Sequence, residues 1–317
     1  MGNSNQSILE KVMKNTHEDY EKWVNNFALN LENIWKENSA KKLMENKQTE
    51  KSVIVIGGGP SLKKKKHLEL LAESNYNRAI IVVDRVLKKA LDAGVTPDKF
   101  KNFFVTSIEP YDRIELHFDH KIIDEFGAKI KGLFPIISSP KTVNRVRKAG
   151  IKIHWFHPLI DYNEGSKSFN GLTAKIVKAK KDGGLPALQT GGNVGTTSWF
   201  VGWQILKYST IGLIGMNHGW DEEDDPSQII THGHENPNVE VDPSVTNITF
   251  KKIYNPDFNC YCIVDPIYQF YSNALKEFIT RSPKRLSTIN ATEGGSIFGE
   301  KITSMQLLEF LEKNQDK

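Results

Sequence analysis

Short apolar runs alternate with amphipathic stretches along most of the chain. The runs at 53–56, 79–83, 103–108, 132–139, 151–156, 210–216 and 286–291 are rich in β-branched and aromatic residues, and the first two are apolar throughout. Continuously apolar runs are typical of strands that are buried on both faces of a sheet. The stretches between them, such as 62–74 and 86–93, have helical character. This alternation predicts an α/β fold with a Rossmann-like, doubly wound and mostly parallel sheet.

The first 50 residues differ from the rest of the chain. Their large apolar residues recur at spacings of three and four, at Tyr20, Trp23, Val24, Phe27, Leu31, Ile34 and Trp35. That spacing predicts an apolar stripe on a helix. We expect residues 1–50 to form an N-terminal helical extension, packed on the main domain or on a second subunit of a homo-oligomer. We expect residues 51–317 to form one nucleotide-binding domain with C-terminal helices and irregular insertions at 159–190 and 218–259.

A triple glycine follows the first predicted strand. Gly57, Gly58 and Gly59 allow a sharp turn and a close approach of a ligand to the backbone. Ser61 could cap a helix over 62–74, whose first N–H groups would then point into the turn and favour a phosphate. The Lys and Ser/Thr of a Walker A loop are absent after Gly59, and the third glycine of a dinucleotide fingerprint is replaced by Leu62. A tight turn without a ligand is the alternative.

A second glycine-rich turn precedes an apolar helix that extends to about Leu206. Its candidate ligand contacts are Thr190, Gly192, Asn193 and Thr196. Two such helix starts in one sheet would offer two anion contacts. Gly195 and Gly202 lie inside this helix, and close packing of the helix on the sheet would explain both.

Three carboxylates lie near the ends of predicted strands. Asp84 follows the second strand, where doubly wound sheets often hold the ribose or base of a nucleotide. Glu109 ends the third strand, and Asp98 stands before that strand, after Pro97. We expect all three to gather at one edge of the sheet. The alternative for each is a helix cap or a turn carboxylate.

The segment 218–259 concentrates acids and histidines, as mobile active-site loops do. His232 is its candidate catalytic residue, and an ordinary loop histidine is the alternative. The five acids at 221–225 and the His-x-His at 232–234 could bind a metal, or could belong to a solvated loop.

The composition narrows the class of protein. A hydrophobic fraction of 38% and a net charge of +4 are ordinary for a globular protein and argue against nucleic acid as the main partner. Cys260 and Cys262 are expected to be free thiols. The sequence shows neither a secretory leader nor a membrane span, so we expect a cytoplasmic protein.

Seven colinear segments resemble one known family. They are VIVIGGGPSL at 53–62, VDRVLKKALDAGVTPD at 83–98, VTSIEP at 105–110, TGGNVGTTS at 190–198, IGLIGMN at 211–217, THGHE at 231–235 and INATEGGSIFG at 289–299. Together they are similar to the central domain of bacterial motility accessory factors, which belongs with the archaeal 6-hydroxymethylpterin pyrophosphokinase (MptE-like) domain. More distantly, the first turn resembles that of bacterial sialyltransferases. The resemblance implies a Rossmann-like domain with a nucleotide-linked donor at the glycine turn.

Two segments favour the motility-factor branch of that family. The pyrophosphokinase branch typically has a TDLDG-like cluster of acids after the third strand, whereas residues 106–110 here contain only Glu109. The NATEGG segment at 290–295 also resembles the motility factors. Asn217 departs from them, because an aspartate usually stands at that position.

The favoured hypothesis is a glycosyltransferase that uses a nucleotide-activated sugar of the nonulosonic or sialic-acid type. Gly57, Gly59 and Ser61 would hold the phosphate and Asp84 the ribose or base. His232 and Glu109 would act in catalysis, and Gly59→Val would abolish nucleotide binding in a folded protein. The alternatives are an ATP-dependent 6-hydroxymethyl-7,8-dihydropterin pyrophosphokinase, with Mg²⁺ held by Glu109 and Asp98, and a non-catalytic nucleotide-binding protein.

Overall fold

A computed structural model of the chain describes residues 8–44, 52–160, 168–178, 180, 183–224 and 250–315. The strands are β1 Asn38–Ser39, β2 Ser52–Ile56, β3 Ala79–Val83, β4 Phe103–Thr106, β5 Lys131–Pro135, β6 Lys152–Leu159, β7 Ala187–Gln189, β8 Thr210–Ile214, β9 Trp220–Asp221, β10 Lys251–Asn255, β11 Cys260–Val264, β12 Ser287–Asn290 and β13 Ile302–Ser304. The α-helices are α1 Ile8–Lys36, α2 Lys41–Met44, α3 Ser61–Lys64, α4 His67–Glu73, α5 Leu87–Asp92, α6 Lys121–Phe126, α7 Pro140–Lys148, α8 Phe169–Val177, α9 Val194–Phe200, α11 Pro266–Thr280 and α12 Leu307–Asn314. Three 3₁₀-helices, η1 Asp84–Val86, η2 Asp112–His117 and η3 Gly127–Lys129, and a π-helix, η4 Val201–Ile205, complete the elements.

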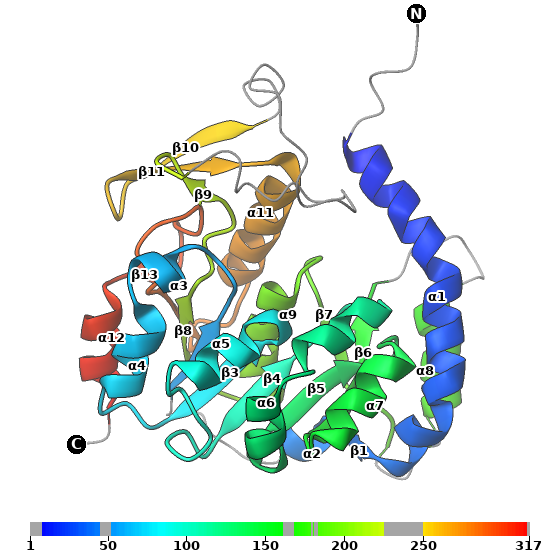
Figure 1. The fold of residues 1–317 in the computed structure, drawn as a ribbon. Helices are drawn as coiled ribbons and strands as arrows, with labels where there is room; N and C mark the ends of the chain where they lie inside the picture. The colour runs from blue at the N-terminus through cyan, green and yellow to red at the C-terminus, as the bar shows by residue number, and fades with distance from the viewer. Residues whose placement is uncertain are drawn as a thin grey trace, which may run out of the picture.

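The central sheet has ten strands in the order β1-β6-β5-β4-β3-β2-β8-β12-β13, with β7 also paired to β6 (Figure 1). Its described pairings are all parallel. The chain builds outward from β2 to β6, then returns to the other side of β2 and adds β8, β12 and β13. The predicted doubly wound, mostly parallel sheet is therefore confirmed, and its strand order reverses between β2 and β8.

Both faces of the sheet are covered, as the continuously apolar strands predict. Along β2, Ile54 and Ile56 face one core cluster and Val53 and Val55 face the other. The first cluster includes apolar residues of α1, α4, α5, α7 and α12, and the second those of α9, η4 and α11. Alternate residues of one strand thus enter two separate cores, which is why residues 53–56 are all apolar.

The N-terminal helix packs on this chain's own domain. Trp23, Phe27 and Ile34 are buried in the first core cluster, and Trp23 and Phe27 contact Phe169 of α8. The Asn26 amide donates hydrogen bonds of 2.9 Å to the carbonyl oxygens of Pro110 and Ile137, in the loops that follow β4 and β5. The apolar stripe is thus largely accounted for within one subunit, and a homo-oligomer through this helix stays a prediction.

Several predicted boundaries are wrong. The helix expected over 62–74 is two helices, because Lys66 has a left-handed φ of 52° between α3 and α4. The insertion at 159–190 contains α8 and β7, and the insertion at 218–259 contains β9 and β10, which pair with β11 in a small antiparallel sheet. Strands as short as β7 and β9 contain too few residues to show an alternation of apolar and polar positions in the sequence.

His154 is buried in β6, and its Nδ1 lies 3.0 Å from the Lys152 carbonyl oxygen. Burial lowers the pKa of His154 to about 4. Between pH 6.5 and 4 the unfolded chain therefore binds a proton that the folded chain does not, so stability is complete above pH 6.5 and falls as the pH falls. We expect the shifted pKa of His154 to reduce the free energy of unfolding by about 3 kcal/mol as the pH falls from 6.5 to 4. Urea unfolding of wild type and His154→Gln near pH 7 and pH 4.5 measures it, and identical pH dependences would contradict the assignment.

The two cysteines, Cys260 and Cys262, are free thiols on β11. No helix within the described residues is both long and apolar enough to cross a membrane.

Candidate functional site

A large cavity lies where the strand order reverses. It has a volume of about 680 Å³ and opens at the carboxyl ends of β2, β3, β4 and β8. Ligands of open α/β sheets bind in the crevice at such a switch point, and the volume is in the range of small-molecule sites. The cavity is lined by the turn at 57–60, the turn at 192–195, residues 215–216 after β8, and side chains of η1, η2 and α11.

The three glycines of the first turn differ in their structural roles. The amides of Gly57 and Gly59 donate to the carbonyl oxygens of Ile214 and Gly215, at 2.8 and 2.7 Å. A Cβ on Gly57 would lie 2.5 Å from the Gly215 oxygen, and one on Gly59 would lie 2.7 Å from the same oxygen. Gly58 is exposed to the cavity, and its amide makes no hydrogen bond with the described residues. The turn therefore offers a ligand the amide of Gly58, whereas Gly57 and Gly59 hold the turn against β8.

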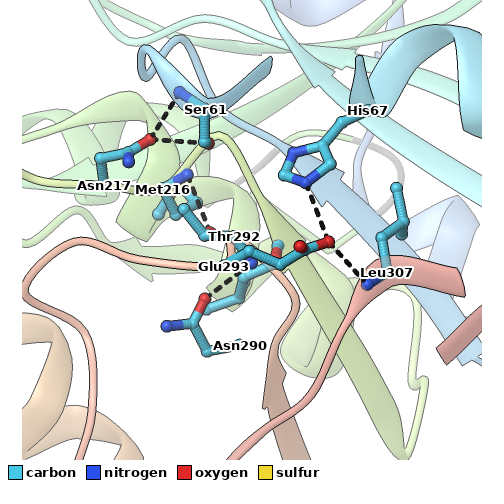
Figure 2. Close-up of polar contacts among 9 residues, drawn as sticks. Ser61, His67, Met216, Asn217, Asn290, Thr292, Glu293 and Leu307 are labelled. Atoms are coloured by element: carbon cyan, nitrogen blue, oxygen red, sulfur yellow. Dashed lines mark hydrogen bonds and ion pairs between the residues drawn. The ribbon is translucent and has the colours of Figure 1, made fainter. Parts of the chain in front are cut away.

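Ser61 is not the helix cap that we predicted. The residue before α3 is Pro60, and Ser61 is the buried first residue of the helix. Its Oγ and its amide both donate to Oδ1 of Asn217, at 2.8 and 3.3 Å (Figure 2). Ser61 thus joins the turn after β2 to the segment after β8.

The NATEGG segment supports this arrangement from behind. The Thr292 hydroxyl accepts from the Met216 amide at 3.2 Å, and the Thr292 amide donates to Asn290 at 2.9 Å (Figure 2). Glu293 lies 3.3 Å from the buried His67 ring and accepts from the Leu307 amide at 3.1 Å, so it joins α4 to the start of α12. The segment is a scaffold beneath the site, and its residues stand outside the cavity lining.

We expect Asn217→Leu to destabilise the protein by about 3 kcal/mol, because it leaves the buried amide and hydroxyl of Ser61 without an acceptor. Asn217→Asp keeps the acceptor oxygen and is expected to cost less. Urea unfolding of Asn217→Leu, Ser61→Ala and the double variant measures their coupling. Additive losses would show that the two side chains do not stabilise each other.

The second glycine-rich turn is built as predicted around a helix start. Asn193 caps α9 by accepting the Thr196 amide at 2.8 Å, and Gly191 and Gly192 have left-handed φ values of 57° and 80°. Gly192, Asn193, Val194 and Gly195 line the cavity. Thr190 and Thr196 are buried and hydrogen-bond within the turn, so they shape it from behind.

The predicted gathering of three carboxylates is wrong for Asp98. Asp84 and Glu109 follow the neighbouring strands β3 and β4 and both line the cavity. Asp98 precedes β4, so it lies toward the opposite edge of the parallel sheet, where its 59% exposed side chain pairs with Lys129. Asp98 and Glu109 therefore do not form a magnesium site together.

The acidic segment after β8 is also engaged within the chain. Lys64 of α3 pairs with Asp221 at 2.6 Å and with Asp224 at 2.5 Å. Within the described residues, no group of three or more His, Cys, Asp or Glu side chains is arranged to hold a metal ion. His232 and Asp225 lie outside the described residues, so the predicted role of His232 stays a prediction.

Basic and aromatic side chains complete the cavity, and the sequence patterns did not single them out. They are Arg85 of η1, Arg113 and His117 of η2, His218 and Trp220 after β8, and Tyr268 and Tyr271 of α11. Tyr268 stacks with His218 and meets Trp220 edge to face, with ring centroids 6.2 and 5.0 Å apart. Arg85 directly follows Asp84, and that position at a strand end was an available signal. The tyrosines lie more than 50 residues further along the chain than Met216, and nothing in their local pattern links them to the turns.

Burial perturbs several ionisable groups of the cavity. It raises the pKa of Asp84, although hydrogen bonds from Ser107 and the Arg85 amide act in the opposite direction. It lowers the pKa of His117 and raises the pKa of Tyr268 to about 12. Perturbed groups that line one cleft are typical of a functional site.

The fold and cavity define a Rossmann-like α/β protein with a cavity at its switch point that is lined by both arginine and carboxylate side chains. Residues 25–223 match the family model described as 6-hydroxymethylpterin diphosphokinase MptE-like, and the chain belongs to this family. Membership supports a transferase in general.

Among solved structures, the chain is similar to the MAf glycosyltransferase from Magnetospirillum magneticum AMB-1, with a TM-score of 0.55 and 17% identity. The match covers 84% of this chain and 37% of that chain, so this chain spans little more than a third of that protein's length. At this identity the likeness concerns the fold. The comparison with curated proteins found no match.

Proposed function

We propose that the protein is a glycosyltransferase that binds a nucleotide-linked sugar donor in the switch-point cavity. The observation that carries this proposal is the presence of two arginines, Arg85 and Arg113, in a cavity wall that also holds the carboxylates of Asp84, Glu109 and Asp224. Arg85, Arg113 and His117 line it together with the Gly58 amide and the start of α9, whereas its described carboxylates are not clustered for a metal.

This wall suits the departure of a nucleotide phosphate. When the bond between sugar and phosphate breaks, negative charge develops on the phosphate oxygens. Arginine side chains and oriented amides at a helix start stabilise such charge in a partly enclosed site. Tyr268 and Tyr271 supply aromatic surface on which a base or a sugar ring can pack.

The two arginines of the cavity support a donor that carries two anionic groups. A sugar of the nonulosonic or sialic-acid type brings a carboxylate in addition to the phosphate of the nucleotide. Arg85 and Arg113, from two different elements, could each receive one of these anions, since guanidinium groups bind both carboxylate and phosphate in a bidentate manner. The fold shared with a solved glycosyltransferase also supports this proposal.

An ATP-dependent pterin pyrophosphokinase is the second candidate, because the family description names that activity. In it the transferred group needs Mg²⁺ to neutralise its charge. Asp84 and Glu109 lie at neighbouring strand ends, but the Asp84 carboxylate is buried and held by Ser107 and the Arg85 amide. The described residues therefore do not fit a magnesium site.

Calorimetric titration with CMP, UDP and GDP in chelator, and with ATP in Mg²⁺, separates the candidates. We expect binding of a pyrimidine nucleotide without metal, and about a tenfold loss of affinity in Arg113→Gln. The matched control is Arg281→Gln, whose side chain is 76% exposed on a distant helix end. Binding of ATP with Mg²⁺ alone would favour the pyrophosphokinase, and nucleotide binding without turnover of any sugar donor would favour a non-catalytic protein.

A further inference from the structure

We propose that His117 is the general base of the transfer and that Asp84 is the residue that positions and charges it. This inference rests on the proposed function and uses the same cavity. It assigns a catalytic role to a histidine that lies within the described residues, in 3₁₀-helix η2, and that no sequence motif indicated.

The geometry places the two residues on packed elements at one wall. Asp84 begins η1 at the end of β3, His117 ends η2, and the two 3₁₀-helices contact each other. Both side chains line the cavity, as do Glu109 and Arg113. A base in this wall would be within the same cavity as a donor held by the arginines and the glycine turn.

The Asp84 carboxylate is fixed in place. It is 3% exposed, and it accepts the Ser107 hydroxyl at 2.6 Å and the Arg85 amide at 2.7 Å. Both carboxylate oxygens thus have partners other than His117, so Asp84 would act on a neighbouring imidazolium through its charge and not through a triad-type hydrogen bond. With so little of its side chain exposed, Asp84 suits this role better than the ribose contact that we predicted.

The charges around His117 favour a neutral ring at pH 7. Burial, Arg85, Arg113 and His120 all lower its pKa, and Asp84 raises it in part. The result lies below the ordinary value of 6.5, so the ring can accept a proton at neutral pH. Burial raises the pKa of Asp84, but the Ser107 hydrogen bond, His117 and Arg85 act in the opposite direction. Protonation of His117 therefore favours the Asp84 carboxylate, which in turn stabilises the cation.

The step balances without a further reagent. His117 takes the proton of the acceptor hydroxyl while the acceptor oxygen forms a bond to the anomeric carbon of the donor. The bond from that carbon to the phosphate oxygen breaks, and its electron pair leaves with the nucleotide phosphate. The proton on His117 is then released to solvent. With water as acceptor, the same step is donor hydrolysis.

The test uses CMP-sialic acid as the donor, water as the acceptor and CMP as the binding probe. We expect His117→Gln to slow release of CMP by about 10² to 10⁴-fold and to keep the affinity for CMP within about threefold. His120→Gln, three residues away and outside the cavity lining, is the matched control and should keep the wild-type rate at pH 8.

A second readout does not depend on the substrate. Proton–nitrogen spectra of the nine histidines, with the His117 signal identified by its loss in His117→Gln, give the titration of this ring directly. Asp84→Asn removes the charge that raises its pKa, so we expect the His117 midpoint, and the acidic limb of the rate profile, to move to lower pH. A purely structural Asp84 would lower the rate without moving the midpoint.

The outcomes separate the inference from the function on which it rests. A wild-type protein that neither binds CMP nor turns over the donor would overturn the proposed function, and this inference with it. CMP binding with undiminished turnover in His117→Gln would overturn the general-base assignment alone. An unchanged His117 midpoint in Asp84→Asn would overturn the role of Asp84.

Discussion

Gly59→Val is expected to lose at least about 3 kcal/mol of stability, because the new side chain has no room within the protein itself. Its Cβ would lie 2.7 Å from the Gly215 carbonyl oxygen and would collide with the Asn217 amide that holds Ser61. Relief of this clash requires the turn to leave β8, and the hydrogen bond from the Gly59 amide to Gly215 would then break. From the sequence we expected this variant to stay folded and to lose only its ligand. From the structure we expect it to be destabilised.

Gly58→Ala is the matched variant that addresses the ligand. Its Cβ would meet the Arg85 side chain at 3.3 Å, and that flexible side chain can shift. We expect a change in stability below about 1 kcal/mol and a loss of nucleotide affinity of about tenfold, because the methyl group would lie against Arg85, a proposed contact of the donor. Urea unfolding and calorimetric titration of both variants measure this contrast. A stable Gly59→Val protein would contradict the packing role of Gly59 against β8. An unchanged affinity in Gly58→Ala would contradict the ligand contact assigned to Gly58.

The sequence predicts the sheet well because both of its faces are buried. Strands such as 53–56 and 79–83 enter two cores at once, so a continuous apolar run identifies them without knowledge of their neighbours. The requirement for glycine at Gly57 and Gly59 has a non-local cause. Both residues contact the end of β8, about 155 residues further along the chain, and the sequence alone does not show which strand lies beside β2.

The site is predicted in part, and its errors have a common cause. Residues that directly follow strands, such as Asp84 and Glu109, reach the cavity because parallel strands share their carboxyl edge. Asp98 precedes its strand and therefore lies toward the other edge, so chain direction could have excluded it. His117 and Tyr268 reach the cavity through a 3₁₀-helix and a distant α-helix, and their positions depend on tertiary packing.

The broken helix over 62–74 illustrates a second kind of error. Its lysines have good helix propensity, but Lys66 adopts a left-handed conformation and Lys64 pairs with Asp221 and Asp224. Long-range charge pairing and the docking of α4 against α12 override local propensity here.

Glu109→Gln is expected to reduce donor turnover by about 100-fold, and this loss should not depend on magnesium. Glu109 lines the cavity, where a carboxylate would stabilise the positive charge that develops on the sugar ring as its bond to phosphate breaks. The amide that replaces it has the same shape but lacks the charge. The assay is release of CMP from CMP-sialic acid by wild type and variant, in chelator and at increasing Mg²⁺, with Asp98→Asn as a control at the opposite edge of the sheet.

The dependence on magnesium decides between the two transfers. A pyrophosphoryl group needs a divalent cation against its charge, so a site with Glu109 as a ligand would need more Mg²⁺ in Glu109→Gln. In a sugar transfer the leaving phosphate is stabilised by arginines and amides, and chelator should change the wild-type rate by less than about twofold. Activity that chelator abolishes and Mg²⁺ restores, with a raised Mg²⁺ requirement in the variant, would replace the glycosyltransferase by the pyrophosphokinase.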